Sequence, residues 1–148
     1  MSNIFFWENS DEFGCFSNFW AGPYIIDGKS WPTTEHYFAA MKTLDPLAQE
    51  KIRDAITPGL AKKLGREVVL RDDWDQIKFD VMLTALRAKF SDLYPVLKDK
   101  LISTGENDIY EDSPYDHVWG TGRRGSIGNG QNLLGKALMQ VRSELKKV

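Results

Sequence analysis

The chain has 148 residues, a single cysteine (Cys15) and a formal net charge of −2. A chain of this length buries about 68–70% of its unfolded surface, so we expect one domain, residues 1–148, whose core needs no disulfide. The lone thiol and the lack of any apolar run near ~18 residues predict a cytoplasmic protein without membrane contact. The slight negative charge argues against a broad surface for duplex DNA but leaves the handling of one nucleotide or modified base open.

The first thirty residues carry β-strand signals. Residues 4–7 are apolar and aromatic and predict a buried strand. Residues 24–26 and 29–31 flank Asp27-Gly28, a pair typical of two-residue primed turns, so we expect a β-hairpin there. Much later in the chain, residues 109–111 predict one further short strand.

From residue 31 onward the signals are mainly helical. Capping residues before a proline predict helices beginning at Pro46 and Pro58, and Gly65 is expected to end the second. Three more helices are expected at residues 74–90, at residues 94–103 and after a capping Asn132. The order of elements predicts an α+β fold, a compact helix-rich single domain with a small N-terminal β element.

The segment of residues 31–42 is the most informative part of the sequence. If it forms one helix, Glu35 and Lys42 lie about 20° apart on the helical wheel, with Phe38 between them. Tyr37, Met41 and Leu44 then form the opposite, core-facing side. An acid and an amine beside an aromatic ring can line a pocket. The alternative is that Glu35 is a first-turn acid favoured by the helix dipole and Lys42 a solvated lysine.

Three other segments combine polar groups with aromatic rings. Ser17, Asn18 and Phe19 can stack a ring and hydrogen-bond its edge, or can simply shape a turn. Arg66 follows Gly65 at an expected helix end, and Trp74 lies eight residues beyond it. The last segment contains Asp116, Trp119 and Gly120 in a glycine-rich loop that runs to residue 131, in which Asp116 is either functional or a turn residue.

Several common sites are poorly supported by the sequence. The loop lacks the spacing and the βαβ context of a dinucleotide fingerprint, and there is no Walker loop. His36 and His117 lack further ligands at the spacing of a metal site, and a serine triad is equally poorly supported. Two carboxylates, a lysine, an arginine and several aromatic rings remain, and this set suits sugar or nucleotide chemistry.

Taken in order, these segments resemble the NADAR family, the YbiA-like group. The resemblance covers nearly the whole chain and rests on the following motifs: residues 16–19 (FSNF), 31–38 (WPTTEHYF), 65–66 (GR), Trp74, 88–90 (AKF), 116–120 (DHVWG) and 130–135 (GQNLLG). It implies a helix-rich α+β fold and cleavage of an N-glycosidic bond to a ribose-type sugar. Two substrate classes are associated with the family: ADP-ribose attached to guanine in nucleic acid, and phosphorylated intermediates of riboflavin synthesis.

The resemblance also implies roles for individual residues. The family's functional positions fall on Glu35, Trp74, Asp116 and Trp119, with Lys42 at the position of the helix lysine. We expect Glu35 and Asp116 to stabilise the cationic sugar and protonate the leaving base. Lys42 is either a Schiff-base nucleophile or a phosphate ligand. Neither route needs a metal or redox cofactor.

The remaining predicted contacts concern the substrate. The expected substrate-binding residues are Ser17, Asn18, Phe19, Arg66, Trp74, Trp119 and Gly120. The preferred substrate is predicted to be ADP-ribosylated guanine, including guanine in single-stranded nucleic acid, because Arg123 and Arg124 stand among glycines and can approach a pyrophosphate or a strand. The alternatives are the riboflavin intermediates and a module that binds ADP-ribose without cleaving it.

Overall fold

The computed structural model describes residues 3–123 and 128–147, and its contacts divide the chain into two units. One unit combines residues 1–17 with residues 90–148, and the other is residues 18–89. Helices dominate, and the strands form two separate two-stranded sheets, which confirms the α+β prediction. No helix among the described residues has the length and apolar character needed to span a bilayer.

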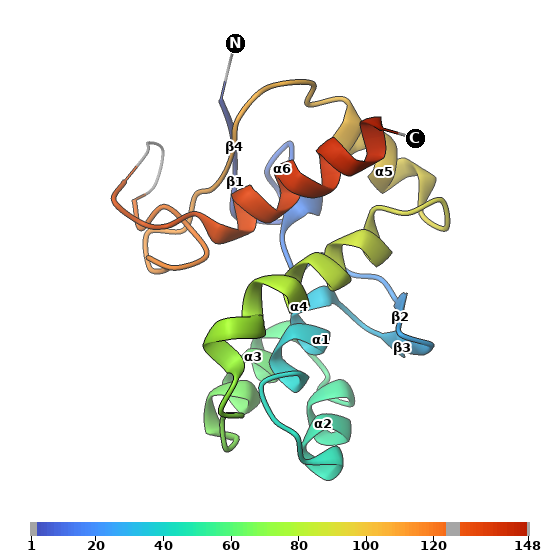
Figure 1. Ribbon diagram of the computed structural model, residues 1–148, viewed down its shortest axis with the longest axis vertical. Helices are drawn as coiled ribbons and strands as arrows, with labels where there is room; N and C mark the ends of the chain where they lie inside the picture. Colours follow the sequence, from blue (N-terminus) through green and yellow to red (C-terminus); the bar gives the residue numbers. More distant parts are fainter. Residues whose placement is uncertain (1–2, 124–127, 148) are drawn as a thin grey trace. The chain divides into compact units, whose positions relative to one another are not determined.

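The unit of residues 18–89 consists of a β-hairpin and four helices. Its elements are β2 (Tyr24–Ile26), β3 (Lys29–Trp31), α1 (Thr34–Ala40), α2 (Pro46–Arg53), α3 (Pro58–Glu67) and α4 (Trp74–Lys89). Helix α1 contacts α2, α3 and α4, and β2 contacts α4 (Figure 1). All seven residues of α1 are buried, so this short helix is the centre of the unit.

The hairpin forms as the sequence predicts. Strands β2 and β3 are antiparallel, with Tyr24 opposite Trp31. Asp27 and Gly28 both have positive φ values, 50° and 81°. Positive φ at both central residues defines the primed turn that matches the twist of a hairpin.

Helix α1 is shorter than expected and ends at Ala40. The N–H groups of Lys42 and Thr43 donate to the carbonyls of Ala39 and Ala40, three residues back, and such bonds tighten and end a helix. Lys42 therefore lies in the turn after the helix, and its placement on the helix was wrong. Leu44, expected on the core side, is 68% exposed, because the chain has already turned away.

Gly65 does not end α3, which continues to Glu67. A Cβ atom at Gly65 would lie 2.9 Å from the Cβ of Ala39, so the glycine lets α3 approach α1 closely. The helix ends where Val68 becomes extended, with φ −77° and ψ 159°. The glycine that looked like a helix terminator is a packing residue.

The other unit joins the beginning and the end of the chain. Its elements are β1 (Ile4–Phe6), the 3-10 helix η1 (Gly14–Phe16), α5 (Pro95–Ile102), β4 (Ile109–Glu111) and α6 (Leu133–Lys146). Strands β1 and β4 are parallel, and α6 packs against β4 and α5 (Figure 1). The ring of Phe16 makes edge contacts with Phe6 and Phe90 at centroid distances of 5.8 and 5.7 Å.

Asn132 precedes α6 as expected but does not cap it with its side chain. It adopts a left-handed conformation, with φ 53°. Its amide oxygen accepts from the Glu111 N–H, at 3.0 Å, and its amide nitrogen donates to the Ile109 carbonyl, at 2.9 Å. The side chain therefore ties α6 to β4, because two backbone groups of that strand need partners at this edge.

Candidate active site

Glu35 lies in the first turn of α1, at the centre of the unit of residues 18–89. The hydroxyl of Thr33 caps the helix by accepting from the His36 N–H, at 3.2 Å. The Glu35 N–H donates to the Asn18 carbonyl, at 3.1 Å. The side chain is only 8% exposed. Carboxylates are almost never this buried unless they are paired.

Asn18 holds the loop before the hairpin against the start of α1. Its side-chain oxygen accepts from the Thr34 hydroxyl at 2.8 Å, and its nitrogen donates to the sulfur of Met82 at 3.6 Å. Both ends of the amide are therefore engaged within the fold. The next residue, Phe19, has the Lys62 ammonium 5.9 Å from its ring centroid. Ser17 belongs to the other unit, where its N–H donates to the Gly14 carbonyl and closes η1.

Phe38 is in contact with two of the predicted site residues. Trp74, the first residue of α4, meets its ring edge to face at a centroid distance of 5.0 Å. The Lys42 ammonium lies 5.7 Å from the same ring centroid. Trp74 and Lys42 therefore both contact the Phe38 ring, and Glu35 lies one helical turn before Phe38 on α1. Trp74 is only 7% exposed, so most of its indole is buried in the core of this unit.

His36, beside Glu35, is a buried structural residue with both ring nitrogens engaged. Nδ1 lies 2.7 Å from the Thr33 hydroxyl, and Nε2 lies 2.9 Å from the Ala55 carbonyl. A carbonyl can only accept, so Nε2 carries the proton and Nδ1 accepts from Thr33. Burial lowers the pKa of His36, and the bond to the Ala55 carbonyl opposes this shift only in part. The neutral imidazole thus joins the start of α1 to the connection between α2 and α3.

Asp116, Trp119 and Gly120 lie together in the other unit, in the loop between β4 and α6. One carboxylate oxygen of Asp116 accepts the N–H groups of Val118 and Trp119, at 3.0 and 2.8 Å. This is the turn geometry that the sequence left open for Asp116. A Cβ at Gly120 would lie 1.9 Å from a carboxylate oxygen of Glu111 and 2.9 Å from the Glu111 carbonyl oxygen, so a side chain there would force Glu111 to shift. Trp119 is half-buried.

Backbone hydrogen bonds fold this glycine-rich loop onto the start of α6. The N–H groups of Leu133 and Leu134 donate to the carbonyls of Val118 and Trp119, both at 3.1 Å. The Asn132 N–H donates to the Gly120 carbonyl at 3.0 Å. These are donors that a helix start usually offers to an anion. The loop occupies them with its own carbonyls.

The two arginines expected to meet a pyrophosphate, Arg123 and Arg124, belong to the segment between Gly120 and Asn132. Arg123 is exposed, and its carbonyl accepts from the Thr121 hydroxyl at 2.8 Å. Arg124 lies outside the described residues. Arg66, also exposed, is in the last turn of α3. Within residues 3–123 and 128–147, no cluster of three His, Cys, Asp or Glu side chains is arranged to hold a metal ion.

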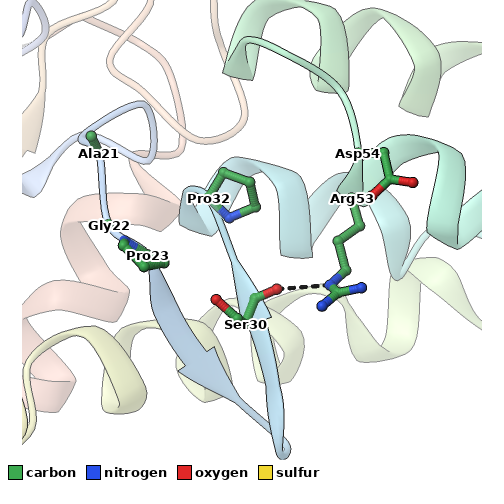
Figure 2. A pocket seen from close by; sticks show the side chains of 7 residues that line it. All are labelled: Ala21, Gly22, Pro23, Ser30, Pro32, Arg53 and Asp54. Atoms are coloured by element: carbon green, nitrogen blue, oxygen red, sulfur yellow. Dashed lines mark hydrogen bonds between the residues drawn. The ribbon is translucent and has the colours of Figure 1, made fainter.

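A surface pocket of about 420 Å³ lies between the hairpin and the end of α2, and it contains none of the predicted site residues. Its lining is Ala21, Gly22, Pro23, Ser30, Pro32, Arg53 and Asp54 (Figure 2). The Nε of Arg53 donates to the Ser30 carbonyl at 2.7 Å, and the Nη1 of Arg53 pairs with the Glu50 carboxylate at 3.1 Å. Because its cation is already engaged and no carboxylate of the predicted chemistry lines it, we do not assign the reaction to this pocket.

The sequence alone missed three features of the Glu35 region. They are the role of His36 in fixing the start of α1, the packing of Gly65 on Ala39, and the presence of Lys62 beside Phe19. Only the last had a usable signal, because Lys62 precedes Arg66 by four residues and thus shares a helix face with it.

Comparison with known proteins places the chain in a family. The NADAR domain model matches residues 5–146, a span that includes residues of both units. The N-glycosidase YbiA of Escherichia coli K12 is 42% identical over 144 residues, which cover 96% of this chain and 88% of YbiA. An N-glycosidase of Nostoc punctiforme is 37% identical, over 98% of this chain and 94% of that protein. The chain belongs to the NADAR family.

Two further matches agree with this placement. The solution NMR structure of E. coli YbiA superposes with a TM-score of 0.87 at 40% identity, covering 99% of this chain and 88% of that one. A riboflavin biosynthesis protein of Vibrio vulnificus is 37% identical over 97% of this chain, which corresponds to 39% of the Vibrio protein. The predicted family and its α+β fold are thus confirmed.

Proposed function

We propose that this NADAR protein is an N-glycosidase that hydrolyses the bond between a ribose-type sugar and a base nitrogen, with ADP-ribosylated guanine as its preferred substrate. The enzyme class is supported by the relatives of E. coli and Nostoc punctiforme, both named N-glycosidases. The observation in the structure that carries the proposal is Glu35. It is a carboxylate that is only 8% exposed, in the first turn of a buried helix, one turn before the Phe38 ring that Lys42 contacts.

The chemistry requires a negative charge near the anomeric carbon. When the C1–N bond breaks, its electron pair leaves with the base, and C1 and the ring oxygen share a positive charge. A carboxylate fixed in a low-dielectric setting stabilises that charge without reorganising during the reaction. Water then adds to C1, one proton goes to the base nitrogen and the sugar gains the hydroxyl. Glu35 is the residue to which we assign the stabilising charge.

Lys42 is assigned an electrostatic role in preference to a nucleophilic one. Its ammonium lies 5.7 Å from the Phe38 ring centroid, and an aromatic face attracts the charged form of an amine. A Schiff-base route needs the neutral amine to attack C1. The contact therefore supports Lys42 as a ligand for the anionic part of the substrate, with the Schiff-base route as the alternative.

Asp116 and Trp119 keep their proposed roles as proton donor and substrate contact. The two backbone N–H groups that bind Asp116 engage one of its oxygens. The other oxygen is the atom that would carry the proton to the leaving base. Gly120 supports this loop, and Asn18 and Phe19 support the start of α1. We further propose that residues 1–148 act as one NADAR domain.

The riboflavin intermediates are the second candidate substrate, favoured by the name of the Vibrio vulnificus relative. The two candidates can be separated directly. The purified protein is incubated with an ADP-ribosylated guanine oligonucleotide and, separately, with a phosphorylated riboflavin intermediate, and base release is followed by chromatography. We expect faster release of ADP-ribose from guanine. Release only from the riboflavin intermediate would reverse the ranking, and binding of ADP-ribose without any release would indicate the non-catalytic module.

A further inference from the structure

Helix α3 carries three basic residues within five positions: Lys62, Lys63 and Arg66. None of them has an acidic partner within residues 3–123 and 128–147, whereas basic side chains on α2, α4 and α6 form ion pairs. In a chain of net charge −2, partners are plentiful. Three unpaired cations close together repel one another, and a site for an anion is a reason to keep them.

The helical wheel separates these cations into a pair and an outlier. Lys62 and Arg66 are four residues apart, so they share one face of α3, about 40° from each other. The buried face of α3 is marked by Ala61 and by Gly65, which meets Ala39 of α1. Lys62 flanks that buried face, whereas Lys63 lies on the side directly opposite to it. The pair thus lies nearer to α1 than Lys63 does.

Contacts place the pair beside the Glu35 helix. Lys62 has its ammonium 5.9 Å from the ring of Phe19, and the preceding residue, Asn18, binds the Glu35 N–H through its carbonyl. Arg66 follows Lys62 by one turn and adjoins Gly65, which packs against Ala39, one turn after Glu35. The two cations therefore run alongside α1 from the Glu35 end toward its C-terminus.

Three other places that could bind an anion among the described residues are already occupied by groups of the protein. The N–H groups at the start of α6 bind carbonyls of the glycine-rich loop. Arg53, in the surface pocket, is bound to Ser30 and Glu50, and Arg71 is bound to Asp73. The helix dipole favours the charge of Arg66, which lies in the last turn of α3. It does not favour the charge of Lys62, which lies one turn earlier.

We propose that Lys62 and Arg66 form a phosphate subsite that binds the 5-phosphate or the diphosphate on the substrate's ribose while Glu35 acts at C1. This inference rests on the proposed N-glycosidase function and names the part of the protein that selects phosphorylated sugars. Guanidinium and ammonium groups suit phosphate oxygens, and Arg can bind two of them at once. The ammonium of Lys62 lies beside the apolar ring of Phe19, where water screens its charge less than in open solvent.

The test uses the full chain and a readout independent of turnover. Ribose 5-phosphate, ADP-ribose and unphosphorylated ribose are titrated by NMR into the Glu35→Gln protein, alone and combined with Lys62→Gln or Arg66→Gln. Each of the two changes should weaken binding of a phosphorylated probe roughly tenfold, as expected for a charge-assisted hydrogen bond, and leave ribose unaffected. Lys63→Gln, with the same charge change on the opposite face, is the matched control and should bind like its parent.

The outcomes separate this inference from the proposed function. A loss for ribose 5-phosphate identifies a monophosphate site, and a loss for ADP-ribose alone identifies a diphosphate site. Equal losses in the Lys63→Gln control would mean that only general charge matters, and unchanged binding in Lys62→Gln and Arg66→Gln would overturn the subsite. If the wild-type protein binds the phosphorylated probes through these residues but releases no base from either substrate, the subsite stands and the proposed function fails.

Discussion

The Glu35 region and the glycine-rich loop are built in opposite ways. Around Glu35, side chains make the contacts that matter: the Thr33 cap, the Asn18 amide, the His36 imidazole and the Phe38 ring. In the described part of the loop from Asp116 to Asn132, the bonds that join the loop to the start of α6 run between backbone groups, glycines leave room for them, and the Asp116 and Asn132 side chains bind further backbone groups. A substitution near Glu35 therefore changes the chemistry by changing a functional group. A substitution of a loop glycine is instead expected to disturb the backbone of the loop, because the added side-chain atoms have no space.

The largest effect is expected for Glu35→Gln. The change keeps the shape of the side chain and removes the charge that we propose stabilises the cationic sugar, so turnover should fall by about two to three orders of magnitude. The melting temperature should change little, since the surroundings of α1 keep their volume. Base release and thermal unfolding measured on the same preparation provide the check. Near-normal turnover would assign Glu35 to the fold instead of the reaction.

Gly120→Ala tests the loop. Its new methyl group would overlap a carboxylate oxygen of Glu111, 1.9 Å away, and crowd the Glu111 carbonyl at 2.9 Å. We expect the free energy of unfolding to fall by about 1–3 kcal/mol, measured by denaturant titration. Gly59→Ala is the matched control, because the nearest atom to its new Cβ is 3.9 Å away. That variant should be unchanged or more stable by about 0.4–1 kcal/mol. Equal destabilisation by both would contradict a steric cause.

Lys42→Ala distinguishes two roles for one side chain. Loss of a substrate ligand should raise KM about tenfold and leave kcat nearly intact, whereas loss of a nucleophile should abolish kcat. Borohydride added during turnover of the wild-type enzyme is the companion measurement, because it traps an imine as a stable adduct. We expect no sugar mass on the peptide that contains Lys42. An adduct there would establish the Schiff-base route.

The smallest effect concerns His36 and pH. Its pKa is lowered in the folded state, so the unfolded chain takes up a proton first as the pH falls through the ordinary value of about 6.5. The neutral imidazole therefore makes its full contribution to the free energy of unfolding above that pH. Below it, this contribution falls by at most about 1.4 kcal/mol per pH unit until the pH reaches the folded-state pKa. Unfolding free energies of the wild-type and His36→Gln proteins should therefore converge on acidification between pH 7.5 and 5. A constant difference would show that His36 does not bind its proton differently in the two states.

The helix and strand positions follow closely from the sequence because local signals mark them. Asp27-Gly28 specifies the hairpin turn, and Asp45 and Thr57 cap α2 and α3 through their side chains. The errors have one origin, which is tertiary contact. Gly65 has the local character of a helix end, but its position is decided by Ala39 on another helix. Lys42 keeps the helical spacing, but Arg71 binds its carbonyl where the chain has left the helix.

The candidate site was harder to predict than the fold. Periodicity brings Glu35 near Phe38, yet only the structure shows that α1 is buried on all sides and that the Asn18 amide serves the fold. The sequence cannot distinguish a turn role from a catalytic role for Asp116. The same carboxylate can accept two loop N–H groups and still present an oxygen to a substrate. No periodic pattern distinguishes a carboxylate that serves both the turn and the reaction from one that serves the turn alone.

The pairing of β1 with β4 has a consequence for how the protein is made. Ile4 to Phe6 leave the ribosome roughly a hundred residues before Ile109 to Glu111, the strand that completes their ladder. Residues 18–89, a compact unit formed by one continuous stretch of the chain, emerge in between. The apolar, aromatic segment of β1 therefore lacks its partner strand until β4 has been synthesised. Unpaired strand edges of this kind can pair with other chains. During translation, β1 is therefore a segment that we expect to need protection against aggregation.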